Sequence, residues 1–146
     1  MKLLLRLISG PSSVHIGTEF GGLASEGGLA TALRGLTFAL LDMDLPVCVI
    51  MPAYQQLLDK IRGGYETVRT EVPFAMTGST RHRFDILRVN IPRGDRHLSV
   101  HLLRNDTFFG GKEPIYGPAV CGVPDRFTYF SHVALQAISE LELQPS

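Results

Sequence analysis

Apolar residues recur along the first third of the chain in patterns that predict a strand, a helix and a second strand. Residues 14–19 (Val-His-Ile-Gly-Thr-Glu) predict the first strand, and apolar residues recur at helical spacing from Leu29 to about Asp44. Val47 to Met51 is a continuous apolar run closed by Pro52, which is typical of a strand covered on both faces. Together these segments predict a βαβ unit with a right-handed crossover.

The predicted helix is expected to be amphipathic and to bury one face. Its apolar positions are Leu29, Leu33, Leu36 and Leu40, with Ala30, Ala32 and Phe38 nearby. A short helix is predicted to follow the second strand, at residues 55–61.

Alternation of apolar and polar residues then replaces helical spacing. Residues 68–76, 87–91 and 98–102 each alternate, which predicts antiparallel strands. Pro73 suits an edge strand because it lacks an N–H donor, and residues 93–95 (Arg-Gly-Asp) suit a tight turn.

The last part of the chain is predicted to be a Gly- and Pro-rich loop at residues 105–124, followed by a helix capped by Asp125. Residues 1–10 fit either a preceding strand or a loose extension. The fold expected is α/β: a Rossmann-like parallel sheet with an antiparallel excursion at residues 66–104, in a single domain over residues 1–146. The apolar face of the last helix comprises Phe127, Phe130, Ala134, Ala137, Ile138 and Leu141.

Composition and charge exclude several classes of partner. Lys and Arg together number 14, and so do Asp and Glu together, so the formal net charge is zero. No positively charged surface for binding nucleic acid or an anionic membrane is therefore expected. No apolar run reaches the roughly 18 residues of a membrane span, and Arg6 interrupts an opening stretch that could be mistaken for a signal peptide. A cytoplasmic protein is therefore expected. Cys48 and Cys121, both in apolar surroundings, are expected to be reduced, buried thiols.

Two short patterns suggest a metal site, but neither supports one. Asp42 and Asp44 form a D-x-D triplet, yet aspartates that close a helix before a proline are usually solvated. His97 and His101 have the spacing of a zinc pair on a helix, but on the predicted strand they would lie about 13 Å apart. No metal is expected.

The turn between the first strand and the first helix is the candidate site for a phosphate. Gly27 and Gly28 precede the helix that opens at Leu29, and a helix N-terminus favours anions through its N–H groups and dipole. Glycines would let the ligand approach the backbone. Glu26 opposes this interaction, because its carboxylate lies beside the same amides and could occupy them as an internal ligand. The alternative is plain loop chemistry, since no complete phosphate-binding fingerprint is present.

The chain resembles the N-terminal segment of bacterial glycogen synthases and plant starch synthases. In that family a strand ending in Ser-Ser-Glu leads to Lys-Thr-Gly-Gly-Leu, and Glu19 stands eight residues before Gly27, as the family pattern requires. Further matches follow in the family's order across about residues 14–144. They are Val47 to Tyr54 (a strand ending in Pro-x-Tyr), Val100 to Phe109 (a strand leading to Asp-Asn-x-x-Tyr-Phe), Ile115-Tyr116-Gly117 (Leu-Tyr-Gly) and Asp125 to Ser131 (Glu-Arg-Phe-x-x-Phe-Ser).

This resemblance implies the first part of a retaining glucosyltransferase with the two-domain GT-B fold, which transfers glucose from ADP-glucose to the end of an α-1,4-glucan without a metal or other cofactor. It places Ser25, Gly27 and Gly28 at the donor phosphates. It also suggests substrate-binding roles for Glu19, Asn105, Tyr116 and Arg126.

Two departures from the family pattern bear on activity. The family lysine that supports the donor phosphates aligns with Ser25, and the family threonine aligns with Glu26. The domain is also expected to be incomplete at its C-terminus, because the family continues past Ser146 into a second domain. The isolated chain is thus expected to be inactive, and it could associate with itself or with a second chain through an uncovered cleft wall. A non-catalytic glucan-binding or interaction module and an inert remnant of a truncated gene are the alternatives.

Overall fold

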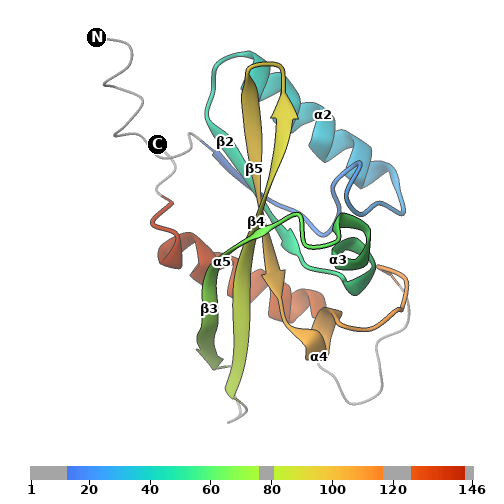
Figure 1. Ribbon diagram of the computed structural model, residues 1–146, viewed down its shortest axis with the longest axis vertical. Helices are drawn as coiled ribbons and strands as arrows, with labels where there is room; N and C mark the ends of the chain where they lie inside the picture. Colours follow the sequence, from blue (N-terminus) through green and yellow to red (C-terminus); the bar gives the residue numbers. More distant parts are fainter. Residues whose placement is uncertain (1–12, 76–80, 117–125, 144–146) are drawn as a thin grey trace.

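The structure, a computed structural model, describes residues 13–75, 81–116 and 126–143 of the chain. In this part of the chain five strands form one sheet in the order β1-β2-β5-β4-β3, with helices packed beside it (Figure 1). The strands are β1 (Ser13–Ile16), β2 (Val47–Pro52), β3 (Glu66–Ala75), β4 (Arg81–Arg93) and β5 (Arg96–Arg104). The helices are α2 (Gly28–Asp42), α3 (Gln55–Ile61), α4 (Asp106–Phe109) and α5 (Arg126–Glu140).

The predicted α/β fold, with a parallel sheet and an antiparallel excursion, is confirmed. Strands β1 and β2 pair in parallel and β2 pairs in parallel with β5, whereas β4 is antiparallel to both β5 and β3. Strand β5 therefore pairs with a parallel strand, β2, on one side and with an antiparallel strand, β4, on the other. The tight turn predicted between the last two strands is present, with Gly94 at a φ of 61°.

The central strands are buried from both sides. All six residues of β2 are buried, as the continuous apolar run predicted. Helix α2 covers the face that carries His15, whose Nδ1 lies 2.9 Å from Thr37 Oγ1. Helix α5 covers the opposite face, where the Tyr129 ring lies 5.7 Å from that of His82 (Figure 1).

The buried face of α2 differs from the prediction. Ala30, Thr37, Phe38 and Leu41 are buried, whereas Leu29 and Leu36 are 51% and 54% exposed. The stripe is rotated because Thr37, a polar residue, faces the sheet and contacts His15 there. A count of leucines alone could not reveal this orientation.

Strand β1 is shorter than predicted, and a short helix was missed. Strand β1 ends at Ile16, so Glu19 lies in the connection to α2 rather than on the strand. Helix α4 interrupts the predicted loop, because the Asn105 side chain accepts hydrogen bonds from the N–H groups of Thr107 and Phe108 and caps it.

Strand β3 forms one edge of the sheet, as Pro73 predicted. Its pairing with β4 shifts register between Thr67 and Arg69 and again before Val72, and Glu71 has a φ of 56°. These shifts break the strict alternation that the sequence indicated.

Several expectations fall outside the described residues: the state of residues 1–10, the side chain of Met76, the burial of Cys121 and the cap at Asp125. Cys48 is buried as predicted, and burial raises the pKa of its thiol to about 11. Within the ranges that the structure describes, no helix is both long enough and apolar enough to span a bilayer.

The two paired isoleucines of β1 and β2 provide a test of this packing. Ile16 and Ile50 are register partners, but Ile16 is 41% exposed and Ile50 is fully buried. We expect Ile50→Ala to lower the free energy of unfolding by about 2–5 kcal/mol, because it leaves a cavity. Ile16→Ala is the matched control, with an expected loss below about 1 kcal/mol. Urea unfolding measures both, and equal losses would contradict the packing described.

Candidate functional site

The candidate site lies where the parallel strands end. Strands β1, β2 and β5 finish at Ile16, Pro52 and Arg104, and their carboxyl ends meet at one edge of the sheet. Ligands of open α/β sheets bind at this edge. The segments that follow these strands carry Glu19, Tyr54 and Asn105.

The carboxylate of Glu19 is the centre of the site. Glu19 is 1% exposed, and its Oε2 accepts hydrogen bonds from the backbone N–H groups of Glu26 (2.6 Å) and Gly27 (3.0 Å). The hydroxyl of Tyr116 donates to Oε1. The turn before α2 therefore wraps around a buried carboxylate.

These hydrogen bonds decide the charge of Glu19. Burial alone would raise its pKa, but the hydrogen bonds from Tyr116 and from the amides of Glu26 and Gly27 outweigh burial and hold the pKa below its usual range. Glu19 is thus ionised at neutral pH. The hydrogen bond to Glu19 in turn raises the pKa of Tyr116.

Glu26 does not occupy the amides of the glycine turn, which corrects the hypothesis that it is their internal ligand. Its carboxylate instead accepts hydrogen bonds from the N–H groups of Ile115 (2.6 Å) and Tyr116 (3.3 Å). Glu19, in the connection after β1, accepts the hydrogen bonds from these amides instead. Glu26 therefore ties the turn to the segment that carries Tyr116.

The glycine turn leaves open space at the N-terminus of α2. Gly27 has an extended backbone, with a φ of −154°, and a Cβ at Gly28 would meet nothing within 4 Å. Neither conformation nor packing requires glycine at Gly28, so the space beside it is accessible to a ligand. Ser25 is exposed on the same turn, and no side chain caps the helix.

Two tyrosine side chains contact the connection that follows β1. The Tyr54 hydroxyl donates to the carbonyl of Thr18 at 2.9 Å, and burial raises the pKa of Tyr54. Tyr116 is 53% exposed, and its hydroxyl lies 3.3 Å from Thr18 Oγ1 in addition to its bond to Glu19. Tyr116 thus presents a ring to solvent while its hydroxyl is held in place.

Asn105 lies at the same edge but is directed into the fold. Besides capping α4, its Nδ2 donates to the carbonyl of Arg83 (2.8 Å) and to the Tyr129 hydroxyl (3.2 Å). The Tyr129 ring is stacked on that of Phe108, with centroids 3.8 Å apart. Asn105 therefore fixes the end of β5 against α4 and α5.

Arg126 begins α5 and binds the segment before Tyr116. Its Nη2 donates to the carbonyls of Pro114 (2.6 Å) and Ile115, and its guanidinium lies 5.2 Å from the centre of the Phe127 ring. The structure thus brings Glu19, Tyr116 and Arg126 together around one segment, next to the glycine turn.

The four residues considered as metal ligands in the sequence lie away from the glycine turn, in ion pairs or on a strand. Asp42 forms an ion pair with Arg93 at 2.7 Å, and Asp44 forms one with Arg96 at 2.8 Å. His97 and His101 lie on strand β5, as predicted. Among the described residues, no three His, Cys, Asp or Glu side chains gather as a metal site would require.

Sequence reasoning did not identify two contributions to the site. The contact between Glu26 and Ile115 joins residues 89 positions apart, and no local pattern signals it. Tyr54 was part of the Pro-x-Tyr match, which is the signal that could have placed its side chain at the carboxyl end of β2.

A family model described as the starch synthase catalytic domain matches residues 14–146. The glycogen synthase of Halalkalibacterium halodurans is 26% identical over 132 residues, which are 90% of this chain and 26% of that protein. A solved catalytic domain of starch synthase IV from Arabidopsis thaliana, bound to ADP and acarbose, matches with a TM-score of 0.65 and 25% identity, over 94% of this chain and 27% of that one. The chain spans about a quarter of the length of these relatives.

The charge of Glu19 predicts a pH-dependent stability. The pKa of Glu19 is lower in the folded protein than the value of about 4.3 expected in the unfolded chain. Ionised Glu19 therefore stabilises the fold at pH values above about 4.3, and this stabilisation is lost as the pH falls through the folded-state pKa. We expect Glu19→Gln to lower the free energy of unfolding by about 1–3 kcal/mol at pH 7, and by less in acid. Urea unfolding across pH measures this, with the exposed Glu142→Gln as control. A deficit independent of pH would contradict an ionised Glu19.

Proposed function

Because the chain belongs to the starch synthase catalytic domain family, we propose that it supplies the N-terminal part of a glucosyltransferase that moves glucose from ADP-glucose to the end of an α-1,4-glucan. The family and the fold inferred from the ordered motifs are confirmed. The donor and the acceptor are part of the proposal. The observation that carries it is the open space beside Gly28, at the N-terminus of α2 and next to the ordered Glu19–Tyr116 pair.

The donor phosphates would contact the glycine turn. The N–H of Gly27 already binds Glu19, so in this proposal Gly28 and the N-terminus of α2 receive the phosphate. Ser25 stands where the family has a lysine, and a hydroxyl there offers a hydrogen bond but no positive charge. Donor binding by this chain is therefore proposed to be weak.

The glucan would contact Tyr116. Of the four residues proposed for substrate binding, Glu19 and Asn105 are buried and Arg126 is occupied by carbonyls, whereas Tyr116 exposes more than half of its surface. Its ring offers an apolar face to a sugar, and Glu19 holds its hydroxyl. Glu19 and Arg126 thus act as positioning residues in this proposal.

The isolated chain is proposed to transfer no glucose, since a GT-B site lies between two domains and this chain spans about a quarter of its relatives. Incorporation of radiolabelled glucose into glycogen above a blank without protein would refute that inactivity. A glucan-binding module is the second candidate, and the exposed ring of Tyr116 favours it. Saturable shifts of Tyr116 with maltoheptaose but none of Gly28 with ADP would support this second candidate.

Restoring the family lysine tests the donor site. We expect Ser25→Lys to strengthen ADP binding by roughly 1.5–3 kcal/mol, because a charged donor contacts phosphate more strongly than a hydroxyl. Titration with ADP, followed by the amide shift of Gly28, measures the change. Glu26 is left intact, because it holds Ile115 and Tyr116.

The control for this substitution is Ser25→Ala, which adds no charge and should bind ADP about as weakly as the unmodified chain. Gly28 shifts that are absent in all three proteins would remove the donor site from the proposal. If Ser25→Lys and Ser25→Ala strengthened ADP binding equally, the added positive charge would not be the cause of the tighter binding.

An apolar stripe on α2 is proposed to mediate self-association. Leu29 and Leu36 on α2, and Met43 at its C-cap, recur every seven residues and are 51%, 54% and 68% exposed. Exposed apolar surface of this kind marks interfaces. We expect sedimentation at high concentration to show dimers that Leu36→Glu abolishes. Leu135→Glu, at a leucine on α5 that is 64% exposed, is the control. A monomer at all concentrations would contradict the proposal.

A further inference from the structure

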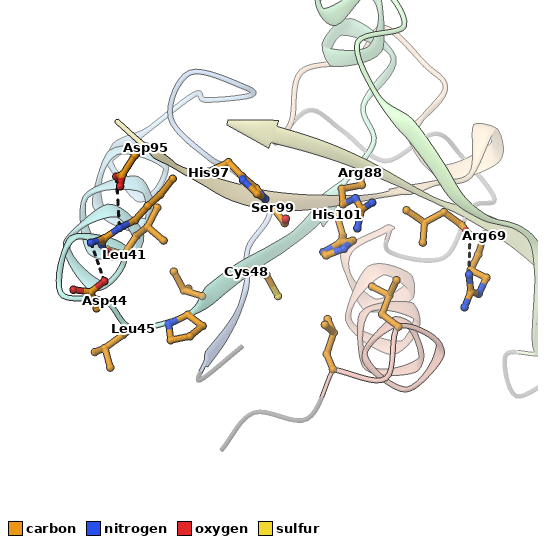
Figure 2. A pocket seen from close by; sticks show the side chains of 16 residues that line it. Leu41, Asp44, Leu45, Cys48, Arg69, Arg88, Asp95, His97, Ser99 and His101 are labelled. Atoms are coloured by element: carbon orange, nitrogen blue, oxygen red, sulfur yellow. Dashed lines mark hydrogen bonds and ion pairs between the residues drawn. The ribbon is translucent and has the colours of Figure 1, made fainter. Parts of the chain in front are cut away.

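A pocket of about 680 Å³ lies at the end of the sheet where β2 and β5 begin, away from the glycine turn. Leu41 and Leu45, at and just after the end of α2, lie on one side of it, and Cys48 of β2 also faces it (Figure 2). Leu141 and Leu143, which follow α5, line it as well, and both are only partly buried. Ligand pockets measure roughly 300–1,000 Å³, so this one has room for several side chains.

The charged groups around this pocket balance one another. Arg88 donates to Glu66 at 2.6 Å, and Arg96 pairs with Asp44 at 2.8 Å. With Glu66 counted, the pocket is surrounded by three arginines and three acidic residues, namely Arg69, Arg88, Arg96, Asp44, Asp95 and Glu66. The apolar part of the lining is less well covered, since Leu45 is 39% exposed. The pocket therefore favours an apolar occupant over an ion.

The chain enters the sheet beside this pocket. Ser13, the first residue of β1, is the register partner of Val47, and its N–H donates to the carbonyl of Pro46 at 3.3 Å. Pro46 and Val47 both line the pocket. Residues 1–12 are therefore attached next to the pocket lining, and twelve residues can span at most about 40 Å. The pocket lies within reach of this segment.

The sequence of residues 1–12 suits an apolar pocket. Residues 3–8 (Leu-Leu-Leu-Arg-Leu-Ile) comprise five large apolar residues and one charge, Arg6. Residues 9–12 (Ser-Gly-Pro-Ser), which join them to β1, have the composition of a turn, so the chain can reverse its direction there. Residues 144–146 (Gln-Pro-Ser), which follow Leu143, offer no large aliphatic side chain. Of the two segments attached at this pocket, residues 1–12 match it better.

We propose that residues 3–8 fold back over the beginning of β2 and β5 and place leucine side chains in this pocket. They cover Leu45, Leu141 and Leu143, while Arg6 stays in water. Burial of apolar surface drives this contact, and the covalent attachment at Ser13 lowers its entropic cost because the segment is always nearby. The contact is separate from the glycine turn, so it does not depend on the proposed sugar transfer.

Nuclear Overhauser cross-peaks between methyl groups of the full chain test this placement. With the leucine, isoleucine and valine methyls labelled, we expect cross-peaks that join Leu4, Leu5 or Leu7 to Leu141 and Leu143. Their absence would overturn the proposal. In a mixture of two differently labelled preparations, cross-peaks between different copies would assign the pocket to a second copy of the chain, which would also overturn it.

The reactivity of Cys48 gives a second test, because this thiol faces the pocket. Cys121→Ser leaves Cys48 as the only thiol. In this background, replacement of Leu4, Leu5 and Leu7 by serine should speed the reaction of Cys48 with iodoacetamide about tenfold or more, because the cover is lost.

The matched control for the leucine variant is Lys2→Ser combined with Arg6→Ser, which changes the same segment but keeps its leucines. The control should react with iodoacetamide at the original rate. The amide signals of Gly27 and Gly28, at the other end of the sheet, should stay in place in both variants and so report that the fold is intact. An unchanged Cys48 rate in the leucine variant would overturn the proposal, and so would an equal acceleration in the control.

Discussion

A buried carboxylate imposes the main constraint on the end of the sheet where strands β1, β2 and β5 finish. Glu19 is ionised and almost fully buried, so donors must surround it, and the chain provides two backbone amides and one phenol. The amides fix the turn before α2, and the phenol fixes Tyr116. A single charge thus orders two segments that are 90 residues apart. Glu19 holds the turn through the amides of Glu26 and Gly27, and a Cβ at Gly28 would meet nothing within 4 Å.

The sheet keeps its two ends chemically distinct. Strands β2 and β5 are largely buried, and among the described residues His101, in the middle of β5, is the one buried polar side chain on them. At the carboxyl ends the described polar side chains are largely paired with one another, and Tyr116 alone among the proposed substrate-binding residues is more than half exposed. Arg88 Nε and His101 Nδ1, in the middle of β4 and β5, have no hydrogen-bond partner among the described residues.

Elements with local signals could be predicted, and contacts between distant segments could not. Strand β2 and helix α3 matched their predicted bounds closely, because a continuous apolar run and helical spacing are local. The buried face of α2 was predicted only in part: Ala30 and Phe38 are buried, but Leu29 and Leu36 are exposed, because Thr37 faces the sheet to meet His15 on another element. Helix α4 was missed, because the cap at Asn105 stands at the start of a segment rich in glycine. The ordered family motifs revealed which residues meet at the carboxyl edge but not the hydrogen bonds among them.

The two outer strands of the sheet, β1 and β3, differ in their capacity to pair with a further strand. On β3, Pro73 lacks a donor and two register shifts twist the backbone, so an incoming chain would find no continuous row of hydrogen-bonding groups. Strand β1 is short but has no proline and no shift in its register with β2, and it carries the exposed Ile16. Among the described residues, β3 is therefore a poorer template for an added strand than β1.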